Sequence, residues 1–229
     1  LHLSIRRQRQ MCIRDRASGW SDFYPEFQFF RDFPEGPRKD ATFVTDIPNR
    51  GFSGGQIITK TPATIPWEVS QRFHPMYGKF TASEDLTVIG RTQGYRPLEV
   101  YRYAELLLIY AEAKAASGSM DASALEALNQ VKRRAAGKDP LTSDPAVDAT
   151  SATVDEIVAE KGWELAAENK RWFDLIRTES LEEAILKRDP SEQVPLVRQP
   201  TKAQYITPLP AEAIATSNLV QNPQGFKIQ

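Results

Sequence analysis

Two neighbouring stretches decide the fold: RYAELLLIYAEAKAASG at residues 102–118 and ALEALNQVKRRAAG at residues 124–137. The first stretch is apolar on almost every side in its middle, which is typical of a helix buried between neighbours, and we expect a helix over Leu98–Ser117. In the second stretch, apolar residues recur every three or four positions with charged residues opposite them, which predicts an amphipathic helix. Because the link between the two is short, they are predicted to form an antiparallel hairpin.

Residues that favour helix ends flank this pair. Gly118 and Gly137 suit the left-handed position that follows a helix, and the Asp121 carboxylate can cap the second helix. Because the pair is apolar throughout its middle, we assign three tyrosines to the core of the hairpin: Tyr101, Tyr103 and Tyr110.

A third helix is predicted to begin at TVDE, residues 153–156, which fits a capping box, and to end near Thr178. A short helix over Leu181–Lys187 is predicted to follow. The apolar residues that we place on the core-facing side of the third helix are Val158, Gly162, Trp163, Leu165, Trp172, Phe173 and Ile176.

The chain divides into segments of different character. Residues 20–97 are rich in aromatic residues, proline and glycine, which predicts loops with short strands at Thr42–Asp46 and Gln56–Thr59. Long irregular segments on a compact scaffold often carry binding functions, so this is the candidate ligand-binding region. Residues 98–188 are the predicted helical scaffold, and residues 189–229 are predicted to form an extended C-terminal segment over the helices.

Residues 1–19 are unlike the rest of the chain. They are rich in arginine and show neither a helical nor a strand period. No apolar run follows the basic residues, so they do not fit a signal peptide. We expect them to be a non-native or disordered basic arm.

The composition excludes several classes of protein. Hydrophobic residues make up 41% of the 229 positions, which fits a globular domain. Lys and Arg total 29 against 30 Asp and Glu, so we expect no broad basic surface for nucleic acid. One cysteine and two histidines exclude an internal disulfide and are too few for a typical zinc site, and we expect no metal and no cofactor. No run of about 18 apolar residues occurs, so no membrane-spanning helix is expected.

The string GFSGG at residues 51–55 matches the G-x-S-x-G pattern of serine hydrolases. That motif requires a strand before the serine and a helix after it. The residues that follow, QIITKTPATIP, are rich in β-branched side chains and broken by Pro62 and Pro66, so they do not predict a helix. We therefore interpret GFSGG as a flexible turn.

Three glutamates, Glu160, Glu164 and Glu168, are spaced four residues apart, which places them on one face of the predicted helix. Paired carboxylates occur in glycosidases, whereas adjacent like charges in a helix repel each other unless cations offset them. Lys161, Lys170 and Arg171 lie near in the sequence, and Arg133 and Arg134 could reach from the neighbouring helix. We favour a structural Glu–Arg network and expect no catalytic residue.

Aromatic residues outside the periodic segments are the candidates for ligand contact. Such a ring can stack on the flat apolar face of a sugar, or it can fill a small core beneath a loop. Trp20 and Trp67 rank first because tryptophan offers the largest stacking surface, and Tyr24 follows. These three are the candidate ligand-binding residues.

Four strings together resemble the SusD/RagB family. They occur in the order of that family and cover about residues 20–229, so the chain looks like the C-terminal part of a longer member. The strings are the helix pair at residues 102–137, EIVAEKGWELAAENKRWFDLIRT at 156–178, QYITPLPAEAIATSNLVQNPQGF at 204–226, and GPRKDATF at 36–43, where Gly36 stands in place of the family's usual Asp.

The resemblance implies a mainly α fold of tetratricopeptide-like helix pairs with long irregular, loop-rich elaborations. It implies a surface-exposed outer-membrane lipoprotein of Bacteroidetes-type bacteria, held to the membrane only through a lipid anchor that this chain does not contain. Such a protein captures oligosaccharides or polysaccharides without catalysis and delivers them to a SusC-like TonB-dependent transporter. The matching strings are scaffold, so the resemblance transfers no ligand-binding residue.

Two other functions stay open on the residues alone. A helical-repeat adaptor would bind another protein through a groove lined by helix residues such as Lys132 and Arg133. A glycoside hydrolase would use Glu164 and Glu168 and would release reducing ends from a polysaccharide.

Overall fold

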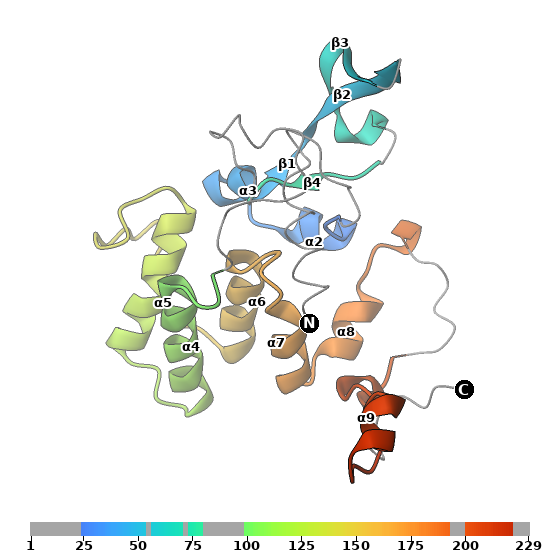
Figure 1. Cartoon of the computed structure of the whole chain (residues 1–229). Coiled ribbons are helices and arrows are strands. Elements are labelled where there is room, and N and C mark those ends of the chain that lie inside the picture. Colours follow the sequence, from blue (N-terminus) through green and yellow to red (C-terminus); the bar gives the residue numbers. More distant parts are fainter. Residues whose placement is uncertain (1–23, 54–55, 71–72, 80–98, 193–199, 222–229) are drawn as a thin grey trace.

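The computed structural model describes residues 24–53, 56–70, 73–79, 99–192 and 200–221. This part of the chain is mainly helical, as predicted from the sequence. Figure 1 shows the helices α4 to α7 gathered on one side, with the strands β2 and β3 projecting from the opposite end of the molecule. No helix among the described residues has the length and apolar character needed to cross a membrane.

Helices α4 (Tyr103–Ala116) and α5 (Ala122–Ala135) form the predicted antiparallel hairpin (Figure 1). Gly118 and Gly137 have the expected left-handed backbone, with φ of 68° and 72°. The Asp121 side chain caps α5 by accepting a hydrogen bond of 3.0 Å from the Ala124 amide. The local signals for this hairpin are therefore confirmed, although α4 begins at Tyr103 and the predicted start, Leu98, lies outside the described residues.

The main core lies where α4 and α5 meet α6 (Val154–Glu164). Helix α6 begins with the predicted capping box, in which the side chains of Thr153 and Glu156 each accept from the other's backbone amide. The buried apolar residues that join the three helices are Leu108, Ala111, Leu128, Val131 and Ile157.

The tyrosines of the hairpin are exposed, so their assignment to its core was wrong. Tyr101, Tyr103 and Tyr110 keep 74%, 68% and 41% of their surface in contact with solvent. Leu106 and Ile109 on the same helix are also exposed. An apolar pattern on every side of a helix predicts burial on every side, but within the described residues α5 and α6 cover only one side of α4.

The predicted third helix is broken in two. Helix α6 ends at Glu164, and a new helix, α7, runs over Arg171–Arg177. Between them, Ala167 and Asn169 have left-handed backbones with φ of 63° and 61°, which no α-helix accommodates. The break leaves carbonyl groups of the last turn without partners inside the helix. Side chains from distant segments bond to the carbonyl of Glu164 and to that of Ala166 just beyond the helix, as described below.

Helix α7 packs on the scaffold through its charged side. The Lys170 ammonium lies 3.0 Å from Glu105 on α4, and Lys161 bridges Glu112 and Asp174 at 3.2 and 2.8 Å. The aromatic residues of α7 consequently face away, and Trp172 and Phe173 are 45% and 67% exposed. Their predicted place in the core was wrong, because that prediction assumed one continuous helix. Val158 and Leu165 are buried as expected.

The loop-rich part begins with two short helices, α2 (Phe27–Asp32) and α3 (Pro37–Thr42). Strand β1 (Phe43–Val44) pairs with β4 (Met76–Tyr77), and a longer hairpin joins β2 (Asp46–Ser53) to β3 (Gln56–Pro66). The strand predicted at Thr42–Asp46 is present only in part, because Thr42 ends α3 and Thr45 separates β1 from β2. The strand predicted at Gln56–Thr59 is present and longer than expected.

The GFSGG string lies at the end of this hairpin. Ser53 closes β2 and pairs with Gln56, the first residue of β3, so a strand follows the serine where a hydrolase requires a helix. Residues 54–55 lie outside the described part of the chain. The interpretation of this string as a turn rather than a nucleophile elbow is consistent with the hairpin.

The C-terminal part contains several short helical segments. Helix α8 (Leu181–Leu186) agrees with the predicted helix to within one residue. The segment that follows was predicted to be extended, and it includes short helical turns. These are η3 (Pro190–Glu192), η4 (Lys202–Tyr205) and α9 (Ala211–Thr216).

The hairpin core provides a direct test of the packing. Leu108 is completely buried, whereas Leu106 on the same helix is 61% exposed. We expect Leu108→Ala to lower the free energy of unfolding by about 2–5 kcal/mol, because it removes buried methyl groups and leaves a cavity. Leu106→Ala should change it by less than about 0.5 kcal/mol. Urea unfolding followed by circular dichroism measures both, and equal losses would contradict the described packing.

Candidate functional site

Four aromatic side chains from separate segments meet beside α2, and we call them the aromatic cluster: Tyr24, Phe27, Trp67 and His74. The rings of Phe27 and His74 are stacked, with centroids 4.3 Å apart and an interplanar angle of 14°. The ring centroid of Tyr24 lies 5.0 Å from that of His74, and the ring centroid of Trp67 lies 5.3 Å from that of Phe27. Trp67 comes from the 3₁₀ turn η1 (Trp67–Val69), directly after β3.

A buried aromatic core supports this cluster. Phe30 joins the cluster to this core. Its ring centroid lies 6.0 Å from that of Trp67 and 5.1 Å from that of Phe43, edge to face in both cases. Phe33 is 1% exposed and packs edge to face on Phe43 at 5.0 Å. Edge-to-face pairs of this kind are favourable beyond the area they bury. The cluster is therefore the outer layer of a packed core.

Two glutamates attach the C-terminal segment to the cluster. The Oε1 atom of Glu192 lies 2.8 Å from His74 Nε2 and accepts a hydrogen bond of 3.2 Å from the Phe27 amide. Glu26 accepts from the amides of Phe29 and Asp189 at 2.8 and 2.6 Å. Residues 26–29 and 189–192 are consequently held side by side, although about 160 positions separate them.

The structure brings two of the three candidate ligand-binding residues together. Tyr24 and Trp67 are both half-buried, and they are linked through Phe27 and His74. Trp20 lies outside the described residues. His74 was not identified as part of this site, because a single histidine in an irregular segment has no spacing that relates it to Phe27.

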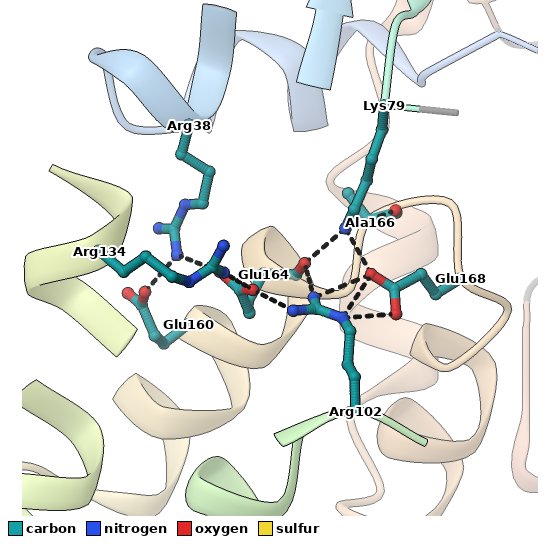
Figure 2. Close-up of polar contacts among 8 residues, drawn as sticks. All are labelled: Arg38, Lys79, Arg102, Arg134, Glu160, Glu164, Ala166 and Glu168. Carbon is teal, nitrogen blue, oxygen red and sulfur yellow. Dashed lines mark hydrogen bonds and ion pairs between the residues drawn. The ribbon is translucent and has the colours of Figure 1, made fainter. Parts of the chain in front are cut away.

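A second cluster, which we call the charge cluster, joins the loop-rich part to the helices (Figure 2). Its carboxylates are Glu160, Glu164 and Glu168, and its cations are Arg38, Lys79, Arg102 and Arg134. These cations come from α3, from the segment after β4, from the start of α4 and from α5, so four separate segments converge here.

Arg102 makes the most contacts in the charge cluster. Its guanidinium donates to both oxygens of Glu168 at 3.0 and 2.9 Å, and to the carboxylate and the backbone carbonyl of Glu164. The Lys79 ammonium donates to the carbonyls of Glu164 and Ala166 at 2.6 and 3.3 Å. Glu164 is the last residue of α6, so its carbonyl has no partner inside the helix, and Ala166 lies just beyond the helix end. Arg102 and Lys79 therefore stabilise the break in the helix.

The predicted Glu–Arg network exists, but with other partners than expected. Arg134 reaches Glu164 as predicted, whereas Arg171 donates to the Val158 carbonyl at 2.8 Å. Glu168 lies beyond the end of α6, so the three glutamates do not share one helix face. Arg38 was missed, because nothing in its local sequence relates it to residues more than 120 positions away.

Arg133 has a structural role of its own. It is 2% exposed and donates to Glu126, to Asp148 and to the Pro140 carbonyl at 2.9, 2.6 and 2.9 Å. These bonds fasten the loop between α5 and α6 and hold the pKa of Asp148 down at about 2. A buried, fully engaged arginine does not line a protein-binding groove. Lys132, the other residue named for the adaptor hypothesis, is half-buried.

The charge cluster does not have the properties of a glycosidase pair. Burial raises the pKa of Glu168, but its hydrogen bonds and charge contacts with Arg102 and Lys79 outweigh this and bring the pKa below its ordinary value. A general acid needs a raised pKa. The Glu164 side chain is 2% exposed and lies among three guanidinium groups. These carboxylates are positioned to hold segments together.

Comparison with known proteins identifies the family. Residues 12–225 match the SusD family. The chain belongs to this family. The match begins within residues 1–19, and the prediction that these form a non-native arm stays a prediction. A search of curated proteins found no match.

Solved structures of SusD-like proteins have the same fold. A SusD superfamily protein from Parabacteroides distasonis superposes with a TM-score of 0.64 at 24% identity, over 95% of this chain and 46% of that one. A laminarin-binding SusD-like protein superposes with a TM-score of 0.60 at 24% identity, over 92% of this chain and 40% of that one. Surface glycan-binding protein A from Bacteroides thetaiotaomicron superposes with a TM-score of 0.59 at 22% identity, over 91% of this chain and 43% of that one. The chain thus spans less than half the length of these SusD-like proteins.

The charge cluster predicts a loss of stability when Arg102 is removed. In Arg102→Ala, Glu164 and Glu168 lose partners while their side chains stay 2% and 9% exposed. Arg38 and Arg134 remain beside Glu164 and Lys79 beside Glu168, so the loss stays below that of a buried charge with no partner. We expect about 1–3 kcal/mol, the cost of leaving buried hydrogen-bonding groups partly unsatisfied. As a control, Lys202→Ala breaks a pair whose side chains are about two-thirds exposed, and it should cost less than about 1 kcal/mol. Urea unfolding at pH 7 measures both, and similar small losses would contradict a structural role for Arg102.

The lowered pKa of Glu168 predicts a pH dependence of stability. Its contribution is fully present above the pKa of an unfolded glutamate, about 4.3, and is lost as the pH falls through the lower pKa of the folded state. We therefore expect wild type and Glu168→Gln to differ most in unfolding free energy at pH 7 and to converge below about pH 4.

Urea unfolding between pH 7 and pH 3 tests this convergence. Glu183→Gln is the control, since Glu183 is 67% exposed in an i, i+4 pair with Lys187, and it should differ from wild type by less than about 0.5 kcal/mol. A difference between wild type and Glu168→Gln that does not change with pH would contradict the electrostatic role of this carboxylate.

Proposed function

We propose that this protein captures oligosaccharides or polysaccharides at the surface of the outer membrane, does not cleave them, and delivers them to a SusC-like TonB-dependent transporter. Membership of the SusD family supports this, because its members are in general non-catalytic, glycan-binding lipoproteins of the outer-membrane surface that work with such transporters. Two proteins of similar fold are described as laminarin-binding and as a surface glycan-binding protein.

The aromatic cluster is the observation that carries the proposal. Aromatic rings suit sugars because the C–H groups on one face of a pyranose ring are apolar and can lie flat on a π-face, while the hydroxyl groups at the edge stay hydrated. Trp67 and Tyr24 are both half-buried residues of the cluster, and the hydroxyl oxygen of Tyr24 is buried. With Trp20, they are the ligand contacts that we propose.

Binding without cleavage fits the chemistry of the carboxylates. Glu164 and Glu168 were the residues of the glycosidase hypothesis, and both are engaged with cations inside the charge cluster. Neither carboxylate belongs to the aromatic cluster. Recognition in this proposal therefore needs only stacking and hydrogen bonds to sugar hydroxyls.

Affinity gel electrophoresis of the full chain tests the proposed function. The gels contain one soluble polysaccharide each: laminarin, starch, xylan or pectin. We expect at least one of them to retard the protein, with no increase in reducing ends when the same polysaccharide is incubated with it. Release of reducing ends would contradict the non-catalytic assignment, and a folded protein that none of the four retards would contradict glycan capture.

Substitutions in the aromatic cluster test the proposed contacts. We expect Trp67→Ala to weaken binding by about 1–3 kcal/mol, the loss typical of one aromatic stacking contact on a nucleic-acid base, and Tyr24→Ala and Trp20→Ala to act in the same direction. Trp172→Ala is the matched control, since this tryptophan is 45% exposed on α7. Circular dichroism confirms folding of each variant. Unchanged binding by all three would contradict the site assignment and leave the family unaffected.

A further inference from the structure

Phe73 combines two unfavourable features. Its φ is 53°, in the left-handed region that bulky side chains rarely adopt. Its side chain is also 61% exposed, so burial does not compensate for the strained backbone. Strained residues persist only where the surrounding structure fixes them, and they concentrate at functional sites. Both features together call for an explanation.

Hydrogen bonds of the preceding turn fix this conformation. The Phe73 amide donates to the carbonyl and to the hydroxyl of Ser70, both at 3.2 Å. Ser70 is 3% exposed, and its amide and hydroxyl donate to the Trp67 carbonyl at 3.1 and 2.8 Å. The position of Phe73 is therefore set by a hydrogen-bonded chain that begins at Trp67.

The turn places Phe73 at the edge of the aromatic cluster. The next residue, His74, is inside the cluster with its ring stacked on Phe27. Val69, in the same turn, is 67% exposed. Two exposed apolar residues, Val69 and Phe73, thus lie close in sequence to Trp67 and His74 of the cluster.

We propose that Phe73 is a further ligand-contacting residue, on whose exposed ring the apolar face of a pyranose unit stacks. This inference rests on the proposed function, since it assigns a residue to the same site. Phe73 is exposed, while the following residue, His74, is held in the cluster by its stacking on Phe27. A sugar that covers Phe73 would bury apolar surface that the protein alone leaves in water.

Four substitutions at this position separate its roles. Phe73→Gly and Phe73→Ala both remove the ring, but glycine adopts a φ of 53° without strain. We therefore expect Phe73→Gly to unfold at a temperature no lower than that of Phe73→Ala, and both to bind about 5- to 150-fold more weakly, as expected for the loss of one stacking contact. Phe73→Trp should keep wild-type binding, whereas Phe73→Leu, which is apolar but has no π-face, should lose it.

The matched control is Phe173→Ala, because Phe173 is 67% exposed on α7. Binding is measured by affinity electrophoresis of the full chain in the gels of laminarin, starch, xylan or pectin that retard wild type. Weak binding by Phe73→Gly, Phe73→Ala and Phe73→Leu, with normal binding by Phe173→Ala and Phe73→Trp, would support the proposal.

Three results would overturn it. If the Phe73 variants bind as wild type does while Trp67→Ala does not, the proposed function stands and Phe73 is not a contact. If the Gly and Ala variants both lack a folded circular-dichroism spectrum, Phe73 is a structural residue. If wild type binds none of the four polysaccharides, the proposed function fails and this inference fails with it.

Discussion

The burial of the Glu164 carboxylate is the constraint on which the rest of the structure depends. Guanidinium groups from α3, α5 and the start of α4 surround it, and each is a contribution from a different segment. A buried carboxylate without such partners would be prohibitively costly. The charge cluster can therefore form only when these segments and α6 come together, so it couples the loop-rich part to the helical scaffold.

The sequence predicted those features that short stretches of chain determine. The α4–α5 hairpin, the Asp121 cap and the capping box at Thr153 were all correct, because each depends on residues within a few positions. The break after Glu164 was missed for the opposite reason. Residues 165–170 offer no strong helix breaker, and the bonds that stabilise the broken end come from Lys79 and Arg102, more than 60 positions away.

The misplaced aromatic residues show a related limit of sequence patterns. Periodicity identifies the apolar side of a helix, but it does not show whether a neighbour covers that side. Tyr103 and Phe173 have core-like spacing and are exposed. In the candidate site, the sequence identified Tyr24 and Trp67 by composition alone. It could not show that Phe27 and His74 join them, since that depends on the return of the chain through the β2–β3 hairpin.

In the proposed function, the aromatic cluster contacts the glycan, and the charge cluster joins the loop-rich part that carries it to the helical scaffold. Binding a flexible glycan costs conformational entropy, and a protein limits the total cost when its own contact groups are already ordered. The aromatic core supplies part of that order, since the ring of Phe30 packs α2 against Trp67 of η1. The charge cluster supplies another part, since it joins α3 and the segment after β4 to the helices (Figure 2). Buried ion pairs thus tie the loop-rich part to the helices, and the proposed contacts of the aromatic cluster and Phe73 with sugar rings depend on this order.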